Sequence, residues 1–250
     1  MNDAVRLESS GGVTTLTLDQ PESRNALTPM LLDGLGDGLA AAVDDHATRV
    51  IVLANTGPAF CAGADLKAGG LAPARRDLPW ILSTIQDSPK PVVAKIAGHC
   101  MGGGVGLAAA CDLSVASEEV KFGFTEVRIG VTPAIISVVC LPKMRRGDAL
   151  ELFLTGERIS ARRAAELGLI TAVAPTVDLD GATAAYVGKL LAGGPAALAA
   201  SKRLVFDVPG LSRGEAFERT VGISRGLFAS EEAAEGMAAF REKRRPSWAP

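Results

Sequence analysis

Short apolar strands that alternate with helical segments constrain the fold of this chain more than any other feature. Three runs share one form: RVIVLANTG at residues 49–57, PVVAKIAG at 91–98 and DLSVAS at 112–117. Continuous apolar runs of this length are typical of strands buried on both faces. Because helical segments separate them, crossover connections are needed, and the runs predict an α/β fold with a mostly parallel sheet.

The N-terminal part predicts a hairpin followed by a helix. VRLESS and VTTLTLDQP flank Gly11 and Gly12, which suit a tight turn between two antiparallel strands. A helix is expected from residue 28 to about 43, with Thr28 as its N-cap and Pro29 at its first position.

From about residue 145 the sequence becomes helical. RRGDALELFLTGE and SARRAAELGLI each predict a helix, and three amphipathic stretches follow between residues 195 and 245. The last of these has Ser230 as its N-cap and two acidic residues in its first turn. We therefore divide the chain into a core domain at 1–194 and a helical region at 195–250, which packs on the core or on a neighbouring subunit.

Composition and charge exclude several classes of protein. At 250 residues the chain can bury a sizeable core without disulfides. Its formal net charge is −2, with both signs spread along the sequence, so no nucleic-acid partner is expected. The basic cluster REKRRP is better explained as a helix end, where cations oppose the helix dipole, than as an RNA-binding patch.

Cysteine usage and the terminal sequence indicate a reducing compartment. The four cysteines form no CxxC pair and no spacing that suits zinc with the two histidines, so neither a metal nor a disulfide is expected. The opening MNDAVRLESSGG lacks the basic and apolar regions of an export signal, and no apolar run reaches membrane-span length. We expect a cytoplasmic protein with no membrane partner.

A glycine tract, HCMGGGVGLAAACD at residues 99–112, stands at a strand-to-helix junction. A phosphate-binding P-loop would need a Lys-Ser/Thr pair after the glycines, and the chain has Val105, Gly106 and Leu107 there. GVGLAA does fit a relaxed dinucleotide-binding fingerprint. However, Glu118 and Glu119 come too early to bind a ribose, so this remains a minor alternative.

A second small-residue loop, GPAFCAGADLK at residues 57–67, follows another predicted buried strand. Loops at the ends of two adjacent parallel strands can converge. Two backbone N–H groups aimed at one point form an oxyanion hole, and small residues let a carbonyl oxygen come within hydrogen-bonding distance. The alternative is that both loops are ordinary tight turns.

Five motifs occur together in the order AFCAGADL, IAGHCMGGGVGLAAACDLSVAS, FGFTEVRIGVTP, LTGERISARRAAELGLITAV and EEAAEGMAAFREKRRPSW. They resemble the enoyl-CoA hydratase/isomerase (crotonase) family over nearly the whole chain. The resemblance implies a repeated ββα spiral core with C-terminal helices that assemble a homotrimer or a dimer of trimers. It also implies an acyl-CoA thioester substrate and no separate cofactor, because coenzyme A is part of the substrate.

The same resemblance assigns roles to individual residues. The backbone N–H groups of Ala64 and Gly103 would hold the thioester oxygen, and Glu126 would move protons at carbon. Glu126 lies among apolar neighbours, where partial desolvation would raise its pKa, although an exposed strand-end or cap carboxylate is the alternative interpretation. Residues assigned to coenzyme A binding are Arg24, Ala26, Ala62, Asp65, Leu66, Phe240 and Lys243.

One family feature is missing. The first catalytic glutamate of well-studied hydratases corresponds to Gly106 here, so hydration by two carboxylates cannot operate in its usual form. We predict an enoyl-CoA hydratase, similar in pattern to the single-glutamate methylglutaconyl-CoA type. A Δ3,Δ2-enoyl-CoA isomerase that uses Glu126 as its only base is the alternative, and an RNA-binding or non-catalytic protein is a weaker one.

The substrate's acyl chain is not identified by these motifs. Residues 66–87 are expected to line the acyl pocket as a loop and helix. Arg75 or Arg76 could meet a carboxylate at the far end of an acyl chain, although exposed loop arginines are usually only solvated.

Overall fold

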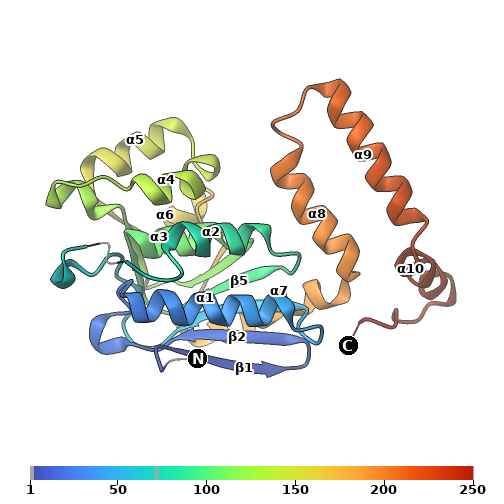
Figure 1. Ribbon diagram of the computed structural model, residues 1–250, viewed down its shortest axis with the longest axis horizontal. Helices are drawn as coiled ribbons and strands as arrows, with labels where there is room; N and C mark the ends of the chain where they lie inside the picture. Colours follow the sequence, from blue (N-terminus) through green and yellow to red (C-terminus); the bar gives the residue numbers. More distant parts are fainter. Residues whose placement is uncertain (1–2, 71–72, 250) are drawn as a thin grey trace.

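The computed structural model describes residues 3–70 and 73–249 (Figure 1). A six-stranded sheet forms its centre, in the order β1-β2-β3-β5-β7-β10. The pair β1 and β2 is antiparallel and the other neighbouring pairs are parallel, as the sequence predicts. The strands are β1 (Val5–Ser10), β2 (Val13–Leu18), β3 (Val50–Asn55), β5 (Val92–Ile96), β7 (Leu113–Ser117) and β10 (Ala172–Ala174).

The N-terminal hairpin and helix are confirmed. Ser10 pairs with Val13 across a turn in which Gly11 and Gly12 both have positive φ, which costs glycine little. Helix α1 (Pro29–Asp44) begins after Thr28, whose side chain accepts a hydrogen bond from the Leu31 N–H at 3.1 Å.

The residue patterns did not predict the strands of a second sheet, which has four short strands. It runs β4 (Ala59–Cys61), β6 (His99–Met101), β8 (Lys121–Gly123) and β9 (Arg158–Ser160), with the first three parallel. Each of β4, β6 and β8 directly follows a strand of the large sheet, and a helical segment comes next. This ββα repeat is the spiral core that the resemblance implies.

Helices cover both faces of the large sheet. Ile51 and Leu53 of β3 contribute to the main core, whereas Val50 and Val52 pack with α7 (Leu179–Ala192) on the other face. The α3 helix (Gly103–Ala110) lies inside the core and is apolar on every side. The remaining core helices are α2 (Leu78–Asp87), α4 (Ala134–Cys140), α5 (Arg146–Thr155) and α6 (Ala161–Glu166); 3₁₀ turns are η1 (Pro21–Ser23), η2 (Leu66–Ala68), η3 (Thr125–Ile129), η4 (Leu141–Lys143) and η5 (Thr176–Asp178).

Three helices follow residue 194, as predicted: α8 (Pro195–Asp207), α9 (Arg213–Phe228) and α10 (Glu231–Glu242). Figure 1 shows them extending from the core as an arm, and α9 has no buried residue. The Ser230 side chain caps α10 by accepting from the Ala233 N–H. Within the described ranges, no helix has the length and apolarity that crossing a membrane requires.

The arm is joined to the core by a buried ion pair. Lys202 of α8 places its Nζ 2.8 Å from the Asp112 carboxylate, which directly precedes β7, and donates to the Ile85 carbonyl at 2.7 Å. The Lys202 side chain is only 6% exposed. A carboxylate and an ammonium thus meet where α8 packs on the core.

Candidate active site

The two small-residue loops meet because β4 and β6 are adjacent parallel strands. Gly63 has φ +85°, and a Cβ placed on it would lie 2.9 Å from the Met101 carbonyl oxygen and 3.2 Å from the Gly103 nitrogen. The backbones can approach this closely only because position 63 has no side chain. The predicted convergence of the loops is confirmed, although β4 and β6 bring it about rather than the longer strands that precede them.

Two residues with unpaired backbone donors line the cavity at this junction. Ala64 and Gly103 both line a cavity of about 550 Å³, and neither N–H donates to an acceptor within the described residues. Gly103 is the first residue of α3, where helical N–H groups have no partner within the helix and the helix dipole is positive. Two backbone donors without acceptors at one cavity meet the first requirement for an oxyanion hole.

Each glycine of the triplet allows a different close contact. A Cβ on Gly102, which has φ +50°, would lie 3.0 Å from Oε1 of Glu126. A Cβ on Gly103 would overlap the Leu27 side chain, and one on Gly104 would overlap the Cys61 carbonyl oxygen. Since Gly104 and Gly106 are both packed against protein atoms, they leave no open phosphate cradle of the dinucleotide-binding kind.

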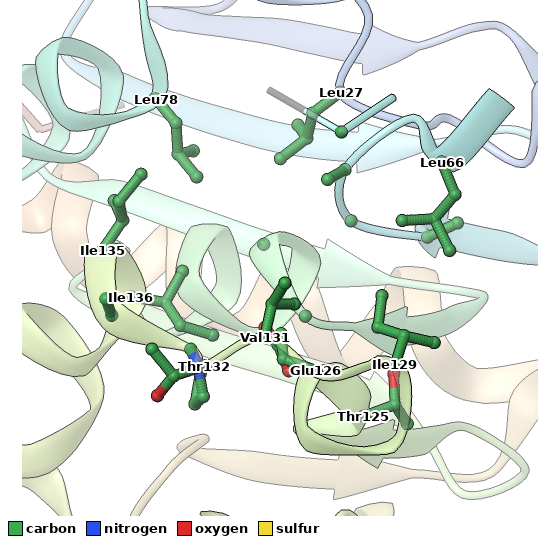
Figure 2. Close-up of a pocket in the computed structure, with 18 of the residues that line it drawn as sticks. Leu27, Leu66, Leu78, Thr125, Glu126, Ile129, Val131, Thr132, Ile135 and Ile136 are labelled. Atoms are coloured by element: carbon green, nitrogen blue, oxygen red, sulfur yellow. The ribbon is translucent and has the colours of Figure 1, made fainter. Parts of the chain in front are cut away.

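Glu126 lies on η3, immediately after β8, and its side chain lines the cavity (Figure 2). Its Oε2 is buried and has no hydrogen-bond partner in the described part of the chain. This burial raises the pKa of Glu126 above its ordinary value, since a desolvated carboxylate is disfavoured. The predicted desolvation is therefore present, and the exposed strand-end interpretation is wrong.

The position of the missing glutamate is filled by another side chain. Gly106 is buried in α3, and a Cβ placed there would overlap Cγ2 of Ile136 and lie 2.9 Å from its Cβ. Ile136 belongs to α4 and is 2% exposed. The site therefore has an apolar group where a second carboxylate would enter.

The segment that contains Arg24 and Ala26 runs beside the first loop. Ala62 donates its N–H to the Arg24 carbonyl at 3.1 Å, and Leu27 donates to the Gly63 carbonyl at 2.8 Å. Arg24 is exposed and Ala26 is buried. Ala62 and Leu66 line the cavity, while Asp65 accepts from the Lys67 N–H and caps η2.

Phe240 and Lys243 are not brought to this cavity within the chain. Phe240 lies on α10 and is 85% exposed, and Lys243 ends that helix in a left-handed conformation. Figure 1 places α10 in the arm, away from α3. Their assignment to coenzyme A binding stays a prediction that depends on a neighbouring subunit.

The expected pocket segment at residues 66–87 contributes only in part. Leu66, Gly69, Gly70 and Leu78 line the cavity, while residues 71–72 lie outside the described residues. Arg75 points to α1, with Nη2 2.6 Å from Asp37. Arg76 stacks on the Trp80 ring at 4.2 Å.

Much of the opposite wall was missed by sequence reasoning. Figure 2 shows Leu27, Leu66 and Leu78 across the cavity from the segment that follows Glu126. In the sequence this segment stands out only as part of a motif, because its apolar residues carry no chemical signal of their own. Its cavity-lining members are Ile129, Val131, Thr132, Pro133, Ala134, Ile135 and Ile136.

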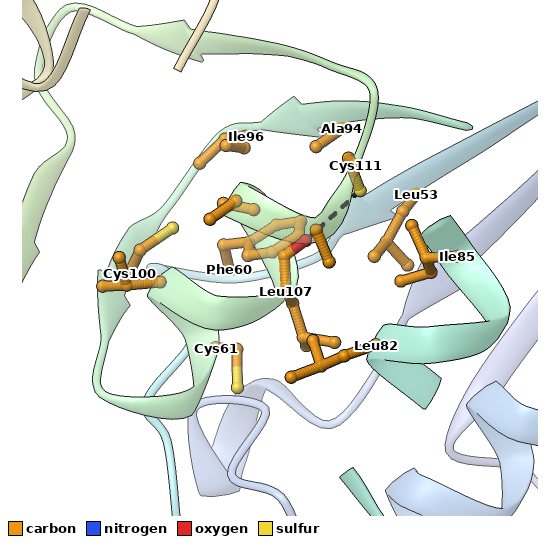
Figure 3. Close-up of a cluster of buried hydrophobic side chains, with 14 of the residues drawn as sticks. Leu53, Phe60, Cys61, Leu82, Ile85, Ala94, Ile96, Cys100, Leu107 and Cys111 are labelled. Carbon is orange, nitrogen blue, oxygen red and sulfur yellow. Dashed lines mark hydrogen bonds between the residues drawn. The ribbon is translucent and has the colours of Figure 1, made fainter. Parts of the chain in front are cut away.

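The cysteines take no part in the site. Cys61, Cys100 and Cys111 lie inside the apolar core around α3 (Figure 3), and Cys140 is also buried. Burial raises the pKa of Cys61 to about 12, so its thiol is neither a nucleophile nor a good metal ligand near neutral pH. No group of metal-ligating side chains is found in the described ranges.

Comparison with known proteins decides the family. The profile described as Enoyl-CoA hydratase/isomerase matches residues 8–250. The chain belongs to this family. A putative enoyl-CoA hydratase of Thermus thermophilus is 34% identical over 94% of this chain and 97% of its own. An enoyl-CoA isomerase/hydratase of Mycosarcoma maydis is 33% identical over 94% of this chain and 92% of its own.

Solved structures agree with this assignment. An enoyl-CoA hydratase of Mycobacterium smegmatis superimposes with a TM-score of 0.92, at 33% identity and with 99% of each chain covered. The crotonase fold inferred from the motifs is thus confirmed for this enoyl-CoA hydratase/isomerase family member. Membership implies an acyl-CoA substrate, and the motif order had identified the family correctly.

Proposed function

We propose that this chain is an enoyl-CoA hydratase that works through an enolate. The thioester oxygen binds the Ala64 and Gly103 N–H groups, and Glu126 transfers the proton. One observation carries the proposal: two backbone donors without acceptors and one carboxylate with an unpartnered oxygen line the same cavity. Donors placed in advance stabilise the developing negative charge without having to reorganise.

In hydration, the Glu126 carboxylate takes a proton from water as the water oxygen bonds to the β-carbon. The electrons of the double bond move to the thioester oxygen and form the enolate. Glu126 then returns the proton to the α-carbon, so that water has been added across the double bond. Several relatives are named as hydratases, which supports hydration as the first candidate. The methylglutaconyl-CoA type of hydratase, which this sequence resembles, also has glycine at the position of Gly106.

Isomerisation is the second candidate, and the contact between Gly106 and Ile136 favours it. With no second carboxylate to orient water, Glu126 can instead remove a proton from C2 of a 3-enoyl-CoA and return it to C4. The double bond moves from C3–C4 to C2–C3. The same two N–H groups hold the dienolate.

For coenzyme A we propose contacts with the segment containing Arg24 and Ala26 and with the first loop at Ala62, Asp65 and Leu66. Phe240 and Lys243 would reach the nucleotide bound by a neighbouring subunit of a homotrimer or dimer of trimers. The exposed apolar residues of α9 and α10, Phe217, Phe228 and Met237, support such an assembly. A cytoplasmic location is part of the same proposal.

The deciding experiment supplies trans-2-hexenoyl-CoA and trans-3-hexenoyl-CoA to the purified protein in separate reactions in ¹⁸O-water. Hydration gives 3-hydroxyhexanoyl-CoA that carries the label, which mass spectrometry detects. Rapid conversion of the 3-enoyl thioester without any labelled 3-hydroxy product would overturn hydration in favour of isomerisation. Turnover of neither thioester would overturn both.

A further inference from the structure

The cavity wall around Glu126 carries no charge of its own. Apart from Glu126, no ionisable side chain lines the cavity within the described residues, and Thr125 and Thr132 are its neutral polar members. Its large side chains are all aliphatic. Three of these lining residues are largely exposed although they are apolar: Leu66 is 62% exposed, and Ile129 and Val131 are each 54% exposed.

Three of the arginines near this wall in sequence have other partners, and Arg24 and Lys67, which are near the lining residues Leu27 and Leu66, do not line the cavity either. Arg75 pairs with Asp37, and the Arg76 backbone N–H donates to Asp33 while its guanidinium covers Trp80. Arg128, between two wall residues, donates through Nε to the Gly156 carbonyl at 3.0 Å. None of the three lines the cavity, so the expectation that Arg75 or Arg76 meets a substrate carboxylate finds no support in the geometry.

Ile136 completes the apolar wall beside the catalytic carboxylate. It fills the space over Gly106 that a polar side chain could otherwise occupy. A carboxylate on the acyl chain would lose its water at this wall without gaining a cation, and it would also be repelled by Glu126. Both effects disfavour binding, and the cost of burying an unpaired charge is large.

We propose that the acyl subsite accepts uncharged, apolar acyl chains and rejects acyl chains that end in a carboxylate. This inference rests on the proposed function, because it assumes that a CoA thioester binds in this cavity. It separates the chain from hydratases of carboxylated enoyl-CoAs, such as the methylglutaconyl-CoA type, with which it shares the glycine at position 106.

The test measures binding of three saturated thioesters with acyl chains of equal carbon number along the backbone: pentanoyl-CoA, glutaryl-CoA and the methyl ester of glutaryl-CoA. Saturated chains are not turned over, so isothermal titration calorimetry reports affinity alone. We expect glutaryl-CoA to bind at least about 100-fold more weakly than pentanoyl-CoA, and the methyl ester to bind within about tenfold of it. The ester separates the effect of charge from that of size.

A pair of lysine variants tests the cause. Val131→Lys adds a cation at a half-exposed wall position. It should lower the ratio of the two dissociation constants, that of glutaryl-CoA over that of pentanoyl-CoA, at least about tenfold. Val177→Lys adds the same charge at a position that is 91% exposed and outside the cavity, and should leave the ratio unchanged. Thermal unfolding of both variants verifies that they fold.

The possible failures are distinguishable. Equal binding of glutaryl-CoA and pentanoyl-CoA by the unmodified protein would overturn this inference and leave the proposed function in place. Binding of none of the three thioesters more tightly than coenzyme A alone would overturn the proposed function as well. Because these readings use the unmodified protein, they stand even where a variant is unstable.

Discussion

Gly104, in the first turn of α3, lies directly against the backbone carbonyl of Cys61 at the end of β4. A Cβ there would overlap the Cys61 oxygen and lie 2.8 Å from the Cys61 Cβ. Backbone atoms cannot rotate away as a long side chain can. The contact brings the start of α3 against the end of β4, so position 104 tolerates no side chain.

Gly104→Ala should therefore abolish nearly all activity and lower the unfolding temperature. The matched control is Gly188→Ala in the middle of α7, where a Cβ meets open space and the change should stabilise by about 0.5–1 kcal/mol. Thermal unfolding and turnover are measured for both. Wild-type turnover by the Gly104 variant would mean that the loops need no such contact.

Glu126→Gln keeps the size of the side chain and removes its ability to accept a proton. We expect turnover to fall by about 10²–10⁴-fold, the usual contribution of a general acid–base, while pentanoyl-CoA binding changes little. Glu119→Gln, at an exposed carboxylate before β8, is the control and should be fully active. If the Glu126 variant retained full turnover, another group would have to move the proton.

The pH dependence of kcat/KM should report the raised pKa of Glu126. Burial makes the carboxyl hold its proton up to a higher pH than an exposed glutamate does, for which the pKa is about 4.3. As a base it is active when ionised, so kcat/KM should fall as pH decreases through that raised pKa. Fluorescence at each pH checks that the protein stays folded. An acid limb at or below the ordinary value would contradict the desolvation.

Gly106 and Ile136 should show energetic coupling. Gly106→Ala alone overpacks the contact and should cost about 1–3 kcal/mol. In the background of Ile136→Ala the overlapping Cγ2 is gone, so the same change should cost at least about 1 kcal/mol less. Urea unfolding of the four proteins completes the cycle. The neighbouring Ile135→Ala serves as the comparison, and an equal effect there would argue against a specific contact.

Lys202→Met removes the cation from a buried pair and retains an apolar stem. Burial already raises the pKa of Asp112 despite the nearby ammonium, so the unpaired carboxylate would be costly. We expect a loss of about 3 kcal/mol in the free energy of unfolding, measured in urea at fixed protein concentration. Adding Asp112→Asn should recover part of this loss. No recovery would mean that Lys202 acts mainly through the Ile85 carbonyl.

The sequence predicted the elements that depend on interactions between residues close together in the chain. The long apolar strands, the cap at Thr28 and the cap at Ser230 depend on a few neighbouring residues, and all are present. Strands β4, β6, β8 and β9 were missed because three residues are too few to display a periodicity. The second sheet exists because of pairings between distant segments.

The candidate site also contains residues that the sequence predicted and residues that it did not. Glu126, Ala64 and Gly103 were predicted because ordered motifs point to them, and the structure places all three at one cavity. Ile136 could not be found, because an isoleucine in a short helix gives no sign of which glycine it will cover. That contact is decided only when α4 packs on α3.

The overlap between position 106 and Ile136 also bears on how this lineage can change its chemistry. A glutamate at 106 has no room until Ile136 becomes smaller, and a smaller residue at 136 alone leaves a void in the wall. A carboxylate at position 106 therefore requires two substitutions made together, because each one alone disturbs the packing between α3 and α4.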